Sequence, residues 1–366
     1  MTLSSPLYRD CARLFMVGFP GPQVDADFAA LMKDGIFGAI LFKRNVGSAQ
    51  ETARLCHDIK TRADRPFILS VDQEGGRVAR LRGTPFTTLP SMRELGQRGD
   101  DALATQTGRL LAHELRAVGF DWDFAPVLDV DTNPANPVIG DRSFSREAQA
   151  VARLGVALAR GLEAGGVASC GKHFPGHGDT TTDSHHTLPR LAHDLERLRR
   201  VELVPFQAFA QAGLASLMTA HVLFEALEPG LPATMSHRVL HGVLRQELGF
   251  EGVLVSDDLE MKAIANHYSV EEAAVQGTLA GVDLFLVCHS AEVQRRAIEA
   301  LVKAVESGRV PRARIAEAHQ RLARLEARFA HPAEDRLATL GDSTHRALAE
   351  GLASHFTGKD PTEWRA

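Results

Sequence analysis

Residues 167–189 read VASCGKHFPGHGDTTTDSHHTLP, a strand-like run followed directly by a polar loop. The run at its start is β-prone, and Pro175, Gly176 and Gly178 prevent a helix from forming after it. From Lys172 onward the segment carries four histidines, two aspartates and one lysine at or beyond the strand end. Loops held by a rigid scaffold often carry catalytic side chains, so we expect this loop to be functional.

Short apolar runs of the same kind recur along the chain, and most are continuously apolar, as in strands covered on both faces. The other seven are Leu14–Gly18, Gly38–Phe42, Pro66–Val71, Asp123–Val130, Ala215–His221, Gly252–Asp257 and Val282–Cys288. Segments with helical spacing lie between them, at Asp101–Ala117, Glu147–Ala164, Ala192–Ala212, His237–Leu248 and Val270–Ala280. Eight strands alternating with helices predict an α/β fold, a single (β/α)₈ TIM-like barrel with C-terminal helices. A doubly wound open sheet is the main alternative, but no GxGxxG follows an early strand.

Polar side chains capable of catalysis follow five of these runs. They are Asp72, Asp129, Lys172 with His173, His221 and Asp257. Active sites of such barrels lie at the carboxyl ends of the strands, so we expect these side chains to meet at one mouth. Neighbouring residues of a strand point to opposite faces. We therefore expect Asp257 to face the mouth and Asp258 to cap the following helix.

The composition of the 366-residue chain is that of an ordinary globular protein, with 44% hydrophobic and 24% charged residues. The net charge is −5, with both signs scattered, which argues against a nucleic-acid-binding surface. No apolar run approaches the roughly 20 residues of a membrane span, and Arg9, Asp10 and Arg13 interrupt any signal peptide. The four cysteines are far apart and form no CxxC pair, which suits a reducing compartment. We expect a cytoplasmic protein with buried free thiols.

The chain shows no internal repeat beyond the β/α alternation and no low-complexity linker. We therefore expect residues 1–330 to form one catalytic barrel. Residues 331–366 are polar, and we expect a docked helix followed by a loose tail of the same domain. We also expect the protein to be a monomer.

Asp183 and His185 lie two residues apart on the polar loop, so on an extended segment they point the same way. A carboxylate there can orient the imidazole and raise its pKa towards neutrality, which makes a general acid/base pair. The alternative is a solvated histidine beside an unrelated aspartate. A metal site is a second interpretation of the loop, because His173-x₃-His177 with Asp179 and His185 supplies imidazole and carboxylate ligands. Two histidines at this spacing bind a metal best when they lie on a helix. Pro175 and Gly176 prevent a helix between them, so we expect no metal.

Two other segments suggest sugar chemistry. Retaining glycosidases pair an attacking carboxylate with a group that protonates the leaving oxygen, and Asp257 is a candidate nucleophile or electrostatic stabiliser. Residues 72–80, DQEGGRVAR, combine carboxylates, two glycines and two arginines. Planar arginines bind carboxylates and hydroxyls through paired donors, and glycines let the backbone approach a ligand closely.

Five motifs together resemble glycoside hydrolase family 3, and in particular its β-N-acetylglucosaminidases of the NagZ type. They are VDQEGGRV (71–78), DFAPVLDV (123–130), GDRSF (140–144), KHFPGHGDTTTDSH (172–185) and LVSDDLEM (254–261). The resemblance runs in order from about Cys11 to Phe329, and the fourth motif is the most specific. It implies a TIM-like barrel, a retaining two-step mechanism and no cofactor or metal.

The resemblance also implies roles for individual residues. Asp257 is implied as the nucleophile, and His185, paired with Asp183, as the acid/base. The residues implied to hold the N-acetylglucosamine ring and its neighbour are Asp72, Arg80, Arg142, Lys172 and His173. Many family members cleave N-acetylglucosamine from 1,6-anhydro-N-acetylmuramic acid units during cytoplasmic peptidoglycan recycling, so a muropeptide is the implied substrate.

Three other functions remain open from the sequence. A neutral imidazole places no second anion beside a glycosyl-enzyme, so phosphate could replace water as the acceptor, giving a phosphorylase. A metal-dependent hydrolase would use the histidine cluster. A non-catalytic sugar-binding protein would need no nucleophile, which the presence of Asp257, Asp183 and His185 together disfavours.

Overall fold

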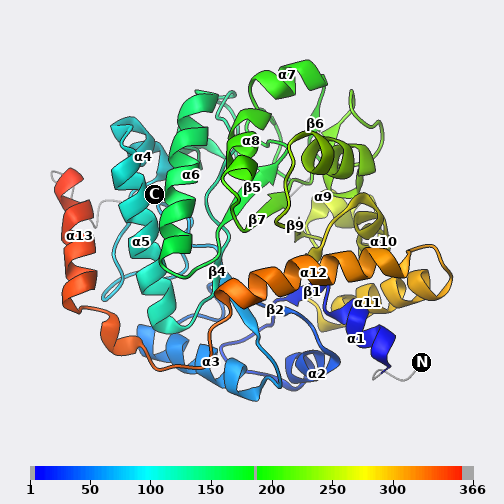
Figure 1. Ribbon diagram of the computed structural model, residues 1–366, viewed down its shortest axis with the longest axis horizontal. Helices are drawn as coiled ribbons and strands as arrows, with labels where there is room; N and C mark the ends of the chain where they lie inside the picture. Colours follow the sequence, from blue (N-terminus) through cyan, green and yellow to red (C-terminus); the bar gives the residue numbers. More distant parts are fainter. Residues whose placement is uncertain (1–4, 185–187, 357–366) are drawn as a thin grey trace.

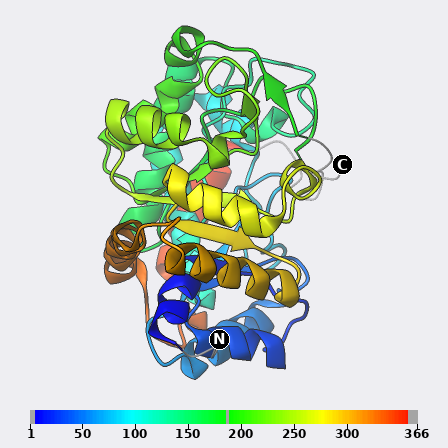
Figure 2. The same ribbon diagram turned by 90° about the vertical axis from the view of Figure 1, so that its right-hand side faces the viewer.

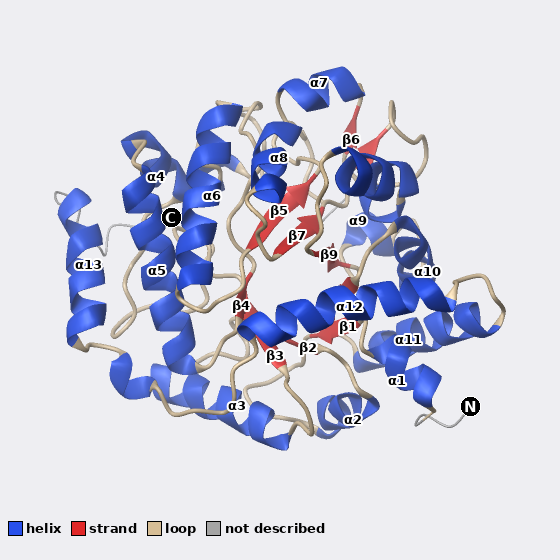
Figure 3. Cartoon of the chain, viewed as in Figure 1, coloured by secondary structure: helices blue, strands red, loops and turns tan. Residues whose placement is uncertain are grey.

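A ring of eight parallel strands forms the centre of the molecule (Figure 1 and Figure 3). The computed structural model describes residues 5–184 and 188–356. In sheet order the strands are β4 (Trp122–Asp123), β3 (Ile68–Val71), β2 (Gly38–Leu41), β1 (Phe15–Val17), β10 (Leu284–Val287), β9 (Val253–Asp258), β7 (Ser216–Thr219) and β5 (Cys170–Phe174). Each strand overlaps one of the eight apolar runs, although β4 shares only Asp123 with the run predicted over Asp123–Val130.

Main-chain hydrogen bonds between β4 and β5 close this sheet into a barrel. The Asp123 N–H donates to the Ala168 carbonyl over 3.0 Å, and the Ala168 N–H donates to the Asp121 carbonyl over 2.9 Å. Farther along, the Lys172 N–H donates to the Pro126 carbonyl over 3.1 Å. The predicted (β/α)₈ barrel is therefore confirmed, and the open doubly wound alternative is wrong.

Helices cover the outside of the barrel, and α10 and α11 lie side by side there (Figure 2). From the N-terminal end to the centre of the chain they are α1 (Pro6–Ala12), α2 (Ala26–Asp34), α3 (Ala49–Arg62), α4 (Met92–Arg98), α5 (Asp101–Val118), η1 (Gly140–Arg142), α6 (Ala148–Ala164), α7 (Leu195–Arg200) and α8 (Leu203–Gln211). They continue with η2 (Ala233–Met235), the π-helix η3 (Arg238–Glu247), α9 (Lys262–Ala265), α10 (Val270–Ala280), α11 (Ala291–Glu306), α12 (Arg312–Phe329), η4 (Leu337–Thr339) and α13 (Ser343–His355).

The segment predicted as one helix over Ala192–Ala212 is two helices, α7 and α8. Val201 leaves the helical conformation between them, with φ −130° and ψ −73°. Pro205 lies four residues later, and its ring excludes a helical carbonyl at Val201 while supplying no N–H to bond it. The prediction of a continuous helix was wrong because this proline breaks it.

The barrel interior is apolar, and α12 closes its amino-terminal end. Leu322, Leu325 and Phe329 of α12 pack in one cluster with the inward side chains of the strands, Trp122 among them. In Figure 1 this helix crosses in front of the strands. The amino-terminal end of the barrel interior is therefore covered by this helix.

The chain beyond the barrel returns along its outside. There α13 packs against α5, where His345 Nε2 lies 2.9 Å from Glu114 Oε1. The expected docked helix is confirmed, while the expected loose tail, residues 357–366, lies outside the described part. The assignment of residues 331–366 to the barrel domain stays a prediction. Over residues 5–184 and 188–356, no helix is both long and apolar enough to cross a membrane.

Candidate active site

A cavity of about 550 Å³ opens at the carboxyl ends of the strands. Seven of the eight predicted site residues line it: Asp72, Arg80, Arg142, Lys172, His173, Asp183 and Asp257. The eighth, His185, lies outside the described residues. The elements that supply them are far apart in the sequence, and the closed barrel brings their carboxyl ends together.

Glu74 is the centre of a buried group of charges on one wall. Arg142 donates to it twice, from Nε to Oε2 and from Nη2 to Oε1, each over 2.8 Å. Lys172 Nζ lies 2.7 Å from Glu74 Oε1 and 2.8 Å from Asp72 Oδ1. Burial acts to raise the pKa of Glu74, but the two cations outweigh it and hold that pKa well below its ordinary value. Burial acts to lower the pKa of Lys172, but its carboxylate partners Asp72 and Glu74 outweigh this effect and raise that pKa overall.

The loop after β3 is shaped so that Asp72 and Arg80 face each other. Gly75 has φ +102°, and a Cβ there would lie 2.8 Å from the Pro90 carbonyl oxygen, so this turn requires glycine. The Gln73 side chain accepts from the Arg80 N–H over 2.7 Å, and Arg80 Nη2 then reaches Asp72 Oδ2 over 3.2 Å. The turn therefore brings Arg80 next to Asp72, the residue with which the loop begins.

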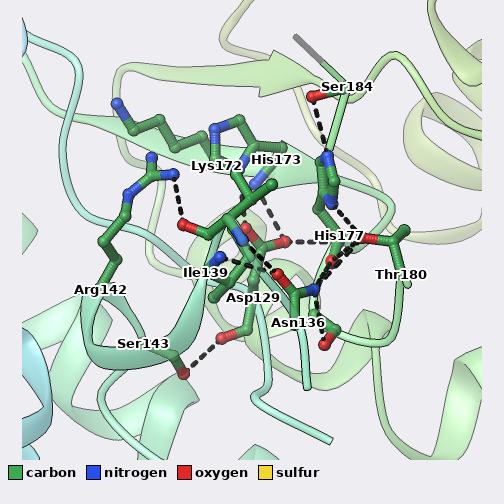
Figure 4. Close-up of polar contacts among 12 residues, drawn as sticks. Asp129, Asn136, Ile139, Arg142, Ser143, Lys172, His173, His177, Thr180 and Ser184 are labelled. Carbon is green, nitrogen blue, oxygen red and sulfur yellow. Dashed lines mark hydrogen bonds and ion pairs between the residues drawn. The ribbon is translucent and has the colours of Figure 1, made fainter. Parts of the chain in front are cut away.

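Asp129 positions the start of the polar loop (Figure 4). Its Oδ2 lies 2.7 Å from His173 Nδ1, and its Oδ1 accepts from the His177 N–H over 2.7 Å. Burial acts to raise the pKa of Asp129, but the two imidazole-bearing residues lower it overall. His173 is therefore held by a carboxylate that is fully buried.

His177 connects this anchor to the residue before His185. Its Nδ1 lies 2.8 Å from Thr180 Oγ1, and its Nε2 lies 3.1 Å from Ser184 Oγ (Figure 4). Burial lowers the pKa of His177 to about 4, so the ring is neutral at pH 7. Ser184 also accepts a hydrogen bond at its carbonyl from the Ala263 N–H over 3.2 Å.

The residues considered for a metal site do not share one centre. Both ring nitrogens of His177 are engaged, and Asp179 instead contacts Thr132 and His193 through its two carboxylate oxygens. No three His, Cys, Asp or Glu residues within 5–184 and 188–356 are grouped so that they could hold a metal ion. His185, which the hypothesis also used, lies outside these ranges.

Asp257 and Asp258 end β9, and both line the cavity. The Asp258 N–H donates to Asp257 Oδ1 over 2.8 Å. Asp258 Oδ1 accepts from the N–H groups of Glu260 and Cys288, each over 3.1 Å. Asp258 thus stabilises the turn and ties β9 to β10. The expectation that it caps the next helix is wrong, because α9 begins later, with Met261 at its N-cap.

His221 lies behind these carboxylates rather than in the cavity. Its Nε2 is 3.0 Å from the Asp258 carbonyl oxygen and its Nδ1 is 2.8 Å from Thr234 Oγ1. Burial lowers the pKa of the His221 ring. His221 follows the end of β7, as the sequence pattern predicted. Its side chain does not face the mouth, however, and instead supports the end of β9.

Several residues that line the cavity were not among the predicted site residues. They are Glu74, His177, Ser184, Lys262 and His289. His289 stacks on Phe42 at the rim, with ring centroids 6.1 Å apart, and its Nε2 lies 3.2 Å from Asp258 Oδ2. Glu74 could have been found from its place two residues after Asp72. His177 and Ser184 lie within the motif at 172–185, whereas nothing in the local sequence marks Lys262 and His289.

Comparisons with known proteins agree with this geometry. Residues 7–325 match the model described as "Glycosyl hydrolase family 3 N terminal domain". The chain is 43% identical over 303 residues to a beta-hexosaminidase from Thiobacillus denitrificans, covering 81% of this chain and 82% of the relative.

Two solved structures are similar over nearly the whole chain. One is a family 3 beta-N-acetylglucosaminidase from a Paenibacillus species, with a TM-score of 0.89 and 42% identity over 96% of this chain and 69% of that one. The other is NagZ from Neisseria gonorrhoeae in complex with N-trifluoroacetyl-D-glucosamine, with a TM-score of 0.77 and 35% identity over 93% of this chain and 97% of that one. The chain therefore belongs to glycoside hydrolase family 3, and within it to the beta-hexosaminidases.

Proposed function

We propose that the protein is a retaining β-N-acetylglucosaminidase with Asp257 as its nucleophile. The observation that carries this proposal is that Asp257, Asp183 and the Asp72–Lys172 pair line one cavity. In the first step the Asp257 carboxylate attacks the anomeric carbon, the glycosidic C–O bond breaks, and the acid/base group His185 gives its proton to the leaving oxygen. In the second step His185 takes a proton from water, which attacks the anomeric carbon and displaces Asp257, so the sugar is released.

His185, oriented by Asp183, is the proposed acid/base. Two contacts of Ser184 support this assignment, because its hydroxyl lies against His177 and its carbonyl against the segment after β9. The chain immediately before His185 is thereby fixed at the edge of the cavity that contains Asp257. An imidazole there can protonate a leaving oxygen and then accept a proton from water.

The proposed ligands of the N-acetylglucosamine ring are Asp72, Arg80, Arg142, Lys172 and His173. Asp72 pairs with Arg80 and Lys172, while Glu74 holds Arg142 and Asp129 holds His173. These contacts keep donors and acceptors in fixed positions, which favours hydrogen bonds to hydroxyl groups because little reorganisation is needed. Charge on this wall is nearly balanced, as expected for a neutral sugar.

We further propose that the substrate is a cytoplasmic muropeptide containing N-acetylglucosamine linked to 1,6-anhydro-N-acetylmuramic acid. The cavity extends beyond the charged wall to Lys262 and His289, leaving space for a second unit. Lys262 is exposed, and its ammonium group makes no hydrogen bond or ion pair within the described part of the chain. A free cation beside the leaving group suits an acidic aglycone.

Phosphorolysis is the second candidate, because Lys262 and His289 could also attract phosphate to the mouth. A panel of N-acetylglucosaminides, glucosides and muropeptide fragments, run with and without phosphate, tests both candidates. We expect free N-acetylglucosamine in either buffer, fastest release from muropeptides, and no effect of chelators. Sugar 1-phosphate as the main product would overturn hydrolysis, and preference for glucosides would overturn the substrate.

A further inference from the structure

A second cavity, of about 400 Å³, lies between α3, the end of α5 and the segment that follows α12. Figure 1 shows this segment running past α3 towards α13. Gly119 in its lining lies just before β4 begins, so the cavity is near the amino-terminal end of the barrel, away from the mouth. The residues that close it, 332–337, lie beyond the part of the chain that matches the family 3 domain.

Basic side chains outnumber acidic ones in this lining. The basic ones are Arg54, His57, Lys60, Arg116 and Arg336, and the acidic ones are Glu334 and Asp335. Two of these cations already have carboxylate partners: Lys60 lies 2.7 Å from the buried Asp121, and Arg336 lies 3.7 Å from Glu334.

Arg116 has no carboxylate partner of this kind among the described residues. It is half-buried, and across residues 5–184 and 188–356 its guanidinium makes no hydrogen bond and no ion pair. Burial lowers its pKa, Asp121 acts in the opposite direction, and the neighbouring Arg336 lowers it further. A guanidinium has five donors, no acceptor and a fixed positive charge, so its natural partner is an anion. An anion in the cavity would supply acceptors for these donors.

Most of the remaining lining is apolar. It includes Ala53 of α3, Val118 of α5, Ala333 and Leu337 of η4. An inorganic ion would leave these walls in contact with water, whereas a ligand with an apolar part would cover them.

We propose that this cavity binds a small amphiphilic anion, whose carboxylate or phosphate pairs with Arg116 and whose apolar part lies against Ala53, Val118 and Leu337. The site shares no residue with the catalytic mouth. It is therefore a separate ligand site, and the proposed glycosidase activity neither requires it nor explains it.

Thermal unfolding of the full chain, titrated separately with hexanoate, hexyl phosphate, hexanol and inorganic phosphate, tests the proposal. A ligand that binds only the folded state raises the Tm in a saturable manner. We expect this from hexanoate or hexyl phosphate, and the stronger of the two identifies the anionic group. Hexanol lacks the charge and phosphate lacks the apolar part, so both should bind at least about tenfold more weakly.

Arg116→Gln should weaken binding of the better probe about tenfold or more without changing the Tm of the free protein, because no native partner is lost. Arg109→Gln, on an exposed position of the same helix outside the cavity, is the matched control and should bind normally. Equal binding by the Arg116 variant, or no saturable shift in the unmodified protein, overturns the proposal. A rise in KM for an aryl glycoside with added probe would place the probe in the mouth and also overturn it.

Discussion

The N–H of Ala263 donates to the carbonyl of Ser184 over 3.2 Å, joining the segment after β9 to the polar loop. Asp257 lies six residues before Ala263, and Ser184 lies directly before His185. The two proposed catalytic groups come from different strands, and this hydrogen bond connects their supporting segments. His177 holds the same serine from the other side.

Replacement of Asp257 by alanine should lower kcat on an aryl β-N-acetylglucosaminide by several orders of magnitude, because it removes the carboxylate proposed to form the covalent intermediate. A fluorinated sugar that slows the second step should leave a mass adduct on Asp257. Asp258→Asn keeps the proposed nucleophile and should still be labelled. An adduct on Asp258, or substantial residual activity of the alanine variant, would show that the assignment is wrong.

Replacement of His185 by alanine should slow substrates with poor leaving groups about 10²–10⁴-fold and activated aryl glycosides much less, since only the former need protonation. Asp183→Asn should act in the same direction. The adjacent His186 provides a control, and its alanine variant should keep the normal dependence on leaving group. Equal loss on both substrate classes in the His185 variant would contradict the acid role.

Loss of the Glu74 charge should destabilise the fold. In Glu74→Gln the buried Arg142 and Lys172 lose their shared carboxylate, and breaking a buried ion pair from one side costs about 3–5 kcal/mol. The Arg77–Asp141 pair near the same cavity is about half exposed, so Asp141→Asn should cost less than about 1 kcal/mol. Urea unfolding at pH 7 measures both. Similar values for the two variants would contradict the buried network.

His177 should make the fold less stable in acid. The unfolded chain protonates this ring near pH 6.5, whereas burial delays protonation in the folded state to about pH 4. The unfolded state therefore binds more protons in this window, and stability falls as the pH drops, by about 3 kcal/mol in total.

Urea unfolding between pH 4 and pH 7 tests this linkage. His177→Asn should be less stable at pH 7, because the contacts with Thr180 and Ser184 change, but its stability should depend less on pH. His267→Asn, at an exposed position, should keep the original pH dependence. If the unfolding free energy of the His177 variant changed with pH as steeply as that of the unmodified protein, the prediction would be wrong.

Lys262 should select acidic leaving groups. Lys262→Gln should raise KM about threefold to tenfold for an aryl N-acetylglucosaminide that carries a carboxylate, and leave the neutral analogue unchanged. Added salt should reduce this difference, because the interaction is solvent-exposed. Lys303→Gln, on the far helix α11, is the control. The same change in KM with both substrates would show that Lys262 does not recognise the negative charge of the leaving group.

The barrel strands were predictable because most lie in short, continuously apolar runs that are followed by a break. Pro205 could have predicted the break between α7 and α8. The helical spacing of apolar residues on both sides of it instead suggested one continuous helix. The seven predicted site residues that the structure describes line one cavity because carboxyl ends of parallel strands converge, a rule that needs no knowledge of contacts.

The electrostatic connections were not predictable in this way. Glu74 meets Arg142 across 68 residues of sequence, and Asp129 meets His173 across 44. Such pairs depend on which loops face one another in the closed barrel. The role of Asp258 depended on where α9 begins, and that start is shifted by the turn at Glu260.

The helix α12, which seals the amino-terminal end of the barrel, turns the active site into a cup with one opening. A polymer cannot thread through it, which favours binding of a chain end next to Asp257, the proposed nucleophile. The portion of the substrate that is cut off lies nearest the opening and departs before the retained sugar. While that sugar is still bound, any alcohol that enters by the same route competes with water. At high substrate concentration the protein should therefore also build new glycosidic bonds.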